Sequence, residues 1–168
     1  YTVWKFLDDA ERELGYPMVI KEAFGSFGAQ VHLANTRAEA EERISSFRGK
    51  AALLQEFIAA SSGRDIRVNV VGNQAVCAIE RVNNQDFRSN ITNGGTGKAI
   101  TPSKAVAKLA IKACRAVGAD FAGVDILFGK DGPVVCEVNS NPHFKSSLKC
   151  TGVDMSEEIM KYIAEQMR

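Results

Sequence analysis

Two apolar segments near the end of the chain carry acidic and amide side chains, and this pattern restricts the fold more than any other feature. The first segment, residues 121–128, is apolar on both faces except at Asp125. The second, residues 134–139, follows after a short turn and carries Glu137 and Asn139. An ionised carboxylate in such a strand is unfavourable unless a cation or a basic side chain balances it. The two segments therefore predict a β-hairpin with a charged site on one face.

The register of this hairpin decides what the site can bind. Glu137 and Asn139 are two residues apart and share one face of the sheet. If position 125 lies opposite 137, Asp125 is a direct neighbour of Glu137, whereas a slip of one residue would separate them. Two carboxylates and an amide oxygen suit Mg²⁺ that also holds phosphates. A buried network in which Arg or Lys neutralises both acids is the alternative.

The rest of the chain mixes helical and strand patterns. Apolar residues at helical spacing predict helices at about 3–14, 36–47, 102–117 and 155–167. Alternating or apolar runs predict further strands at about 18–22, 30–33, 53–58, 66–70 and 75–82. We expect Thr101 to cap the third helix, and residues 83–99 and 140–152 to be loops. Hairpins mixed with helices indicate an α+β fold with antiparallel sheets.

Composition argues against several functional classes. The 168 residues carry a net charge of +1 without a long block of one sign, which argues against nucleic-acid partners and a polybasic membrane patch. No apolar run approaches the roughly 20 residues of a membrane span, and we expect no signal peptide. The four cysteines form no CxxC pair and are interpreted as free thiols of a cytoplasmic protein.

A lysine and a glycine turn early in the chain are suited to a phosphate. Lys21 ends an apolar strand just before Gly25, Ser26 and Gly28. Glycines let backbone N–H groups approach a phosphate, and the lysine adds a point charge. An ordinary β-hairpin turn is the alternative interpretation of the same residues.

Three further segments offer polar groups to a nucleotide. The long polar segment contains Arg88, whose guanidinium can fork onto a phosphate, although a solvated loop has the same composition. Glu56 and Phe57 end an apolar run that could meet a purine edge or form a plain core strand. Asp65 and Arg67 could hold a ribose and a phosphate, or pair with each other at the surface.

Taken in order, these segments resemble the ATP-grasp ligases, and the RimK-type branch most closely. The motifs are Met-Val-Ile-Lys21, the glycine turn, Leu-Leu-Gln-Glu-Phe-Ile, Gly-Arg-Asp-Ile-Arg67, Asp-Phe-Arg-Ser-Asn90, Gly-Val-Asp125 and Cys-Glu-Val-Asn139. The resemblance spans almost the whole chain. It implies an ATP-grasp fold, in which two α+β lobes with antiparallel sheets clamp ATP. Residues 1–60 would form the smaller lobe with a glycine lid, and residues 61–168 the larger lobe with the magnesium site. An N-terminal domain that precedes these lobes in the family is expected to be missing here.

The resemblance also implies an activity. Members of this branch use ATP and Mg²⁺ to join an amino acid, often glutamate, to a carboxylate of a protein C-terminus or a small molecule. The amide forms through an acyl-phosphate, with release of ADP, and Mn²⁺ is a substitute cation. A non-catalytic ATP-binding module that senses nucleotide is the alternative, and a homo-oligomer is left open.

Residue by residue, the resemblance implies three groups of site residues. The catalytic positions, which meet the phosphates and the acyl-phosphate, are Arg88 and Asn90. The nucleotide-binding positions are Lys21, Gly25, Ser26, Gly28, Glu56, Phe57, Asp65, Arg67 and Ser89. The metal ligands are Asp125, Glu137 and Asn139. His143 and Lys145 depart from the family's usual sequence and hint at an acidic amine donor, with exposed loop charges as the alternative.

Overall fold

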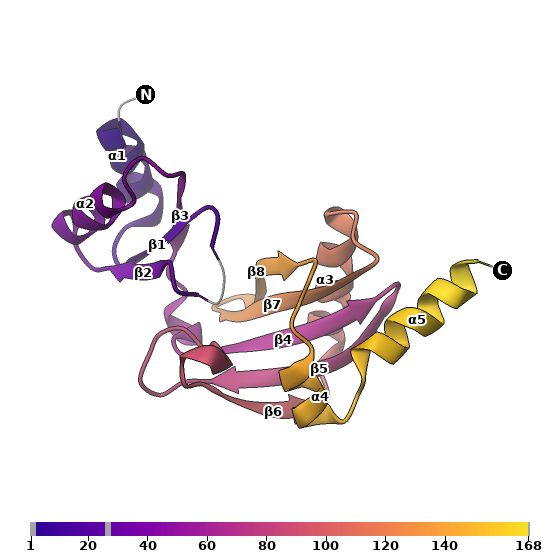
Figure 1. The fold of residues 1–168 in the computed structure, drawn as a ribbon. Coiled ribbons are helices and arrows are strands. Elements are labelled where there is room, and N and C mark those ends of the chain that lie inside the picture. The colour runs from indigo at the N-terminus through magenta and orange to yellow at the C-terminus, as the bar shows by residue number, and fades with distance from the viewer. Residues whose placement is uncertain (1–2, 26–27, 168) are drawn as a thin grey trace. The chain divides into compact units, whose positions relative to one another are not determined.

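The computed structural model describes residues 3–25 and 28–167 of the chain. The chain divides into two compact units, Tyr1–Ala59 and Ala60–Arg168, which are called unit 1 and unit 2 below. Each unit has its own antiparallel sheet (Figure 1). Each unit also has its own apolar core. The α+β class with antiparallel sheets, expected from the sequence, is confirmed.

Unit 1 is a three-stranded sheet with two helices. The strands β1 (Met18–Glu22), β2 (Val31–Ala34) and β3 (Ala52–Glu56) lie in the order β2-β1-β3. The helices are α1 (Val3–Leu14) and α2 (Arg37–Ser46). The core joins Leu7 of α1 and Ala40 of α2 to one face of the sheet.

Alternation along β1 gives this sheet its two faces. Met18 and Ile20 are fully buried in the core, so that Val19 and Lys21 lie on the opposite face. The helix ends follow local sequence rules. Thr36 caps α2 by accepting a hydrogen bond from the backbone N–H of Glu39 at 3.3 Å.

Unit 2 is built on a five-stranded antiparallel sheet in the order β6-β5-β4-β7-β8. Its strands are β4 (Arg64–Val71), β5 (Gln74–Val82), β6 (Thr96–Ile100), β7 (Phe121–Gly129) and β8 (Gly132–Asn139). Its helices are α3 (Lys104–Ala116), α4 (Lys145–Thr151) and α5 (Met155–Gln166), with short 3₁₀ turns at Ala59–Ser61 and Ile91–Asn93. Helix α3 covers one face of this sheet, and α4 and α5 lie on the other (Figure 1).

The two faces of this sheet differ in chemistry. Along β4, Ile66, Val68 and Val70 point into the core beneath α3. Asp65 and Arg67 therefore lie on the opposite face, because side chains alternate along a strand. The sheet thus has an apolar face that packs against α3 and a face whose middle is polar.

The pairing of β7 with β8 shifts by one residue in the middle of the hairpin. Near the turn Ile126 pairs with Val135, whereas Asp125 pairs with Glu137, so that Cys136 is an extra residue on β8. Val135 consequently packs against the core beneath α3, while Glu137 lies on the polar face with Asp125. Of the two registers that the sequence leaves open, the structure has the one in which 125 lies opposite 137, and this bulge produces it.

Three local expectations from the sequence are wrong. Residues 83–99 are not all loop, because β6 adds an edge strand to β5 there. Residues 140–152 contain the short helix α4. Ser103, not Thr101, caps α3, and its hydroxyl accepts a hydrogen bond from the backbone N–H of Val106 at 3.3 Å.

The helices and the cysteines bear on the expectations from composition. None of the helices in the described ranges has the length and apolar character needed to cross a membrane. All four cysteines are free thiols, as expected from their spacing, and Cys77 and Cys114 are buried.

Candidate functional site

Four charged side chains meet on the polar face of the unit 2 sheet, and they are called the charged cluster below. Asp65 and Arg67 come from β4, Arg81 from β5 and Asp125 from β7. Strand pairing places Asp65 opposite Arg81 and Arg67 opposite Asp125. Asp65 and Arg81 are each 6% exposed and Asp125 is 4% exposed, so the cluster is largely withdrawn from water.

Two arginines hold Asp125. Arg67 donates to both of its carboxylate oxygens, from Nε to Oδ1 and from Nη2 to Oδ2 at 2.8 Å. Nη2 of Arg81 lies 2.9 Å from Oδ2 of the same carboxylate. Arg81 also forks onto Asp65, with Nε donating to Oδ1 at 2.7 Å and Nη2 donating to Oδ2. Every carboxylate in the charged cluster therefore has a guanidinium partner.

The two carboxylates of the charged cluster are unequal acids. Burial raises the pKa of Asp125, but the hydrogen bonds and charges of Arg67 and Arg81 outweigh burial and hold that pKa below its usual value. Burial also raises the pKa of Asp65, and here Arg81 together with a hydrogen bond from Ser89 is insufficient to reverse the shift. Asp125 has two guanidinium partners whereas Asp65 shares one, and the negative charge of Asp125 raises the pKa of Asp65 further.

Glu137 and Asn139 extend the polar face on β8. Glu137 lies directly across from Asp125 and is exposed, whereas Asn139 lies across from Gly123. The side-chain amide nitrogen of Asn139 donates to Oε1 of Glu137 at 3.0 Å and to the carbonyl of Gly123 at 3.3 Å. Both bonds use the nitrogen, which leaves the amide oxygen of Asn139 outside them.

The donor set of Asp125, Glu137 and Asn139 fits a hard cation such as Mg²⁺. Two carboxylates and an amide lie on one face, and all three offer oxygen ligands. Within the described ranges, no group of three or more His, Cys, Asp or Glu side chains is placed to hold a metal, so the amide would have to complete the set. The alternative of a basic network is met for Asp125, which has two arginine partners, whereas the hydrogen-bond partner of Glu137 is the amide of Asn139.

Gly123 allows Arg67 to lie close to the sheet. A Cβ at this position would stand 2.8 Å from Cβ of Pro142 and 3.0 Å from Cδ of Arg67. Pro142 belongs to the segment after β8 and is buried. The side chain of Arg67 is therefore confined between its own strand, β7 and this segment.

The segment that contains Arg88 is tied to the sheet. The backbone N–H of Gly63 donates to the carbonyl of Phe87 at 2.8 Å. Asp86 accepts hydrogen bonds from both the backbone and the guanidinium of Arg88, including one from Nη2 at 2.6 Å. Ser89 is buried and hydrogen-bonds Asp65. This part of the segment is therefore held by hydrogen bonds, and Ser89 joins it to the charged cluster.

The carbonyl of Asn90 accepts hydrogen bonds from the backbone N–H groups of Asn93 and Gly95, at 3.0 and 3.2 Å. These bonds close the turn that follows Arg88 and lead the chain into β6. Asn90 is half-buried, so its side chain keeps some access to solvent.

The remaining candidate residues lie in unit 1. Nζ of Lys21 donates to Oε1 of Gln55 at 2.9 Å, on the sheet face away from the helices. Glu56 is exposed at the end of β3, and Phe57 follows it half-buried. A Cβ on Gly25 would stand 2.7 Å from Oε1 of Gln30, so the turn is closely packed there.

Gly28 and Ser26 are the other two candidate residues of this turn. Gly28 has a φ of +70°, a conformation that favours glycine. Ser26, the remaining candidate of this turn, lies outside the described residues. His143 and Lys145 are exposed beyond β8.

Sequence reasoning missed one member of the charged cluster, Arg81. A signal for it exists, because Arg81 follows Cys77 and Ile79 at alternate positions of an apolar strand. A charge at a position that alternation predicts to be buried is the same anomaly that identified Asp125. Asp65 and Arg67 do not form the surface pair that the sequence also allowed, because Asp65 is buried against Arg81 and Arg67 binds Asp125.

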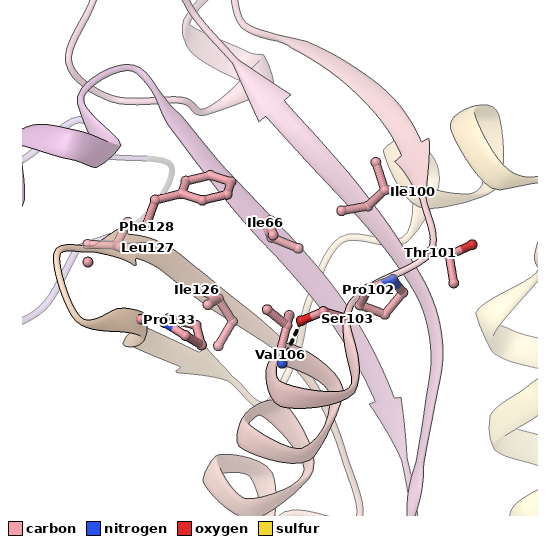
Figure 2. A pocket seen from close by; sticks show the side chains of 12 residues that line it. Ile66, Ile100, Thr101, Pro102, Ser103, Val106, Ile126, Leu127, Phe128 and Pro133 are labelled. Atoms are coloured by element: carbon pink, nitrogen blue, oxygen red, sulfur yellow. Dashed lines mark hydrogen bonds between the residues drawn. The ribbon is translucent and has the colours of Figure 1, made fainter.

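A separate recess of about 400 Å³ lies on the other face of the sheet. Figure 2 shows its apolar lining, with Ile66 and Ile126 from the strands and Val106 from α3. No charged side chain lines it. The recess therefore belongs to the apolar face and is separate from the charged cluster.

Known proteins are similar to this chain in sequence and in fold. The family of the RimK-like ATP-grasp domain matches residues 2–163. A protein of Enterobacter sp. (strain 638) named "Probable alpha-L-glutamate ligase" is 44% identical over 152 residues, which are 89% of this chain and 51% of that protein. The ribosomal protein bS6–L-glutamate ligase of Salmonella paratyphi B is 45% identical over the same shares. This chain spans about half the length of these relatives.

Among solved structures, the ATP-grasp ligase PsnB with its minimal precursor, Mg and ADP superposes with a TM-score of 0.73 at 25% identity. The match covers 98% of this chain and 50% of PsnB. The family match and the structural superposition therefore both identify ATP-grasp proteins as relatives of this chain.

Proposed function

Because this chain belongs to the RimK-like ATP-grasp family, we propose that it is the nucleotide-binding part of an ATP- and Mg²⁺-dependent ligase. The ligase would join a carboxylate to the amine of an amino acid. The observation that carries this proposal is the placement of Asp125, Glu137 and Asn139 on one polar face of the unit 2 sheet. Mg²⁺ that also binds substrate phosphates is typically held by one or two carboxylates, and this face offers two carboxylates and an amide oxygen.

The proposed reaction has two steps, and the chain supplies positive charge for both. The acceptor carboxylate attacks the γ-phosphorus of ATP, which forms an acyl-phosphate and releases ADP. The amine then displaces phosphate from the acyl carbon and forms the amide. Asp125, Glu137 and Asn139 would hold Mg²⁺, and the ion would supply charge that offsets that of the phosphoryl group.

Arg88 and Asn90 are proposed to act on the transferring group. Asp86 fixes the direction of the Arg88 guanidinium before any ligand binds, which reduces the ordering needed when charge develops. Arg67 lies beside Asp125 and Ser89 beside Asp65, and both would contact the nucleotide phosphates.

In unit 1, Lys21 is proposed to meet the phosphate and the adenine, and the backbone of Glu56 and Phe57 to meet the adenine edge. The Gly25–Gly28 turn would close over the phosphates and keep water from the acyl-phosphate. These roles rest on the match of each residue to the family's motifs.

The substrates follow from the relatives, and we propose them for the whole protein. One relative is named for glutamate and a ribosomal protein, and PsnB is solved with a precursor peptide. We propose a peptide or protein carboxylate as acceptor and an acidic amino acid, glutamate in particular, as amine donor. Mn²⁺ would substitute for Mg²⁺, and the free thiols are in keeping with a cytoplasmic location.

Calorimetric titration of ATP into the chain, with and without Mg²⁺, tests the proposal. We expect affinity that depends on Mg²⁺ in the natural chain and the loss of that dependence in Asp125→Asn. In the full-length protein, release of ADP that requires both acceptor and amine separates a ligase from a module that only binds nucleotide. Equal affinity with and without Mg²⁺ would contradict the metal assignment.

A further inference from the structure

Arg81 connects two buried carboxylates that come from different strands. It forks onto Asp65 with both Nε and Nη2, and the same Nη2 lies 2.9 Å from Oδ2 of Asp125. β4, which carries Asp65, lies between β5 and β7 in the sheet. The guanidinium of Arg81 therefore spans the width of β4 and is held at one end by Asp65.

Arg67 holds Asp125 in a different way. It contacts both oxygens of Asp125, and within the described ranges Asp125 is its only ion-pair partner. The side chain of Arg67 is 13% exposed, against 7% for Arg81. If Asp125 gave up one arginine, Arg67 would lose its only carboxylate and Arg81 would still be anchored by Asp65.

We propose that Arg81 is a positioning residue for the magnesium site. Anchored by Asp65, it holds Oδ2 of Asp125 in place while Oδ1 passes from Arg67 to the cation. The guanidinium of Arg67, once released, becomes available to the phosphates of the nucleotide. This inference rests on the proposed function, because it takes Asp125 as a metal ligand.

The arrangement explains why one carboxylate carries two arginines. A buried anion that exchanged its only partner would be uncompensated during the exchange, which is unfavourable. With Arg81 fixed, Asp125 always has one cationic partner, both when Arg67 is bound and when it has left. Residues that orient a metal ligand typically affect metal affinity by about 10- to 100-fold when they are replaced.

Arg81→Lys tests the proposal, because lysine keeps the charge but cannot fork onto Asp65 while reaching Asp125. The measured quantity is the ratio of the Kd for ATP without Mg²⁺ to the Kd with Mg²⁺. We expect this ratio to fall by about 10- to 100-fold in Arg81→Lys. Asp65→Asn removes the carboxylate that anchors Arg81 and should also lower this ratio. If Arg81→Lys does not fold, Asp65→Asn is the variant that tests the proposal.

Arg64→Lys is the matched control. Arg64 pairs with Glu80 at 2.9 Å across the same two strands, on the other face of the sheet. A role limited to stability would lower the melting temperature of Arg81→Lys but would leave the ratio equal to that of Arg64→Lys. The double variant of Arg81→Lys and Asp65→Asn should lose little more than either single variant, because both act through one contact.

Nitrogen-15 spectra of the arginine Nε–H groups give a second, independent readout. On addition of Mg²⁺ and ATP, we expect the Arg67 signal to shift and the Arg81 signal to stay. Equal ratios in all three single variants, or a shift of Arg81 without Arg67, would overturn the positioning role and leave the ligase proposal standing. A natural chain that binds no ATP in the presence of Mg²⁺ would overturn the proposed function and this inference with it.

Discussion

Glu137 is the candidate metal ligand that can be changed with the least disturbance, because it is exposed while Asp125 is buried. We expect Glu137→Gln to weaken ATP binding in the presence of Mg²⁺ by about tenfold or more. The melting temperature should stay close to that of the natural chain, since no core contact is lost. Calorimetry and thermal unfolding measure the two quantities. Asp131→Asn, in the exposed turn of the same hairpin, is the control and should leave both unchanged.

The Asp86–Arg88 pair predicts a pH dependence of stability. The hydrogen bond from Arg88 holds the pKa of the Asp86 carboxyl below its ordinary value of 3.8. A carboxyl with a lowered pKa in the fold stabilises the fold above that value and loses this contribution as the pH falls through the lowered pKa. The contribution is roughly 1 kcal/mol or less, because the pair is partly exposed.

Urea unfolding of the natural chain and Asp86→Asn measures this effect. The difference in the free energy of unfolding should be largest near neutral pH and should vanish as the pH drops below 3.8. A difference that does not change with pH would show that the carboxylate charge of Asp86 is irrelevant to stability.

At the scale of single residues, some site members could be predicted and others could not. Asp125 and Glu137 are visible in the sequence because each is charged in an apolar segment. Arg81 carries the same signal, yet its partners Asp65 and Asp125 become apparent only when β4, β5 and β7 lie side by side. Partner choice depends on strand order, and alternation along one strand does not contain that order.

At the scale of elements, the start of α3 separates two candidate caps. Ser103 accepts a hydrogen bond from the backbone of Val106 (Figure 2), whereas the sequence favours Thr101 because Pro102 follows it. We expect Ser103→Ala to lower the free energy of unfolding by about 1 kcal/mol. Thr101→Ala should change it by no more than about 0.5 kcal/mol. Chemical unfolding of both variants checks this, and the reverse ranking would contradict the cap assignment.

The elements that sequence patterns missed are short and depend on neighbours. β6 has five residues, includes Gly97 and forms because β5 supplies its hydrogen bonds. The helix α4 has seven residues, too few for a helical pattern to stand out. Its Ser147 is buried and accepts a hydrogen bond from the amide of Asn69 at 2.7 Å, which fixes α4 on the sheet. Longer elements such as α3 and β7 were predictable because their own apolar residues define them.

At the scale of the whole molecule, unit 2 is expected to fold without unit 1. The core beneath α3 and the smaller core of Val71, Cys77 and Met155 consist of unit 2 residues alone. Ser61 should be kept, because its hydroxyl accepts a hydrogen bond from the backbone of Phe128 at 3.0 Å. We expect a fragment of residues 60–168 to show cooperative thermal unfolding by circular dichroism. A fragment that melts without a transition would show that unit 1 is needed for the fold.

The extra residue Cys136 makes the β7–β8 hairpin one residue longer than one-for-one pairing requires. In a chain that lost Cys136, the strands would pair evenly from the turn onward, and Glu137 would still meet Asp125. A chain that gained a residue there would need a second bulge or would turn Glu137 toward the apolar layer beneath α3. We therefore expect the hairpin to tolerate deletion of Cys136 better than insertion of a residue beside it. The Mg²⁺ dependence of ATP binding in the deletion and insertion variants would show this difference.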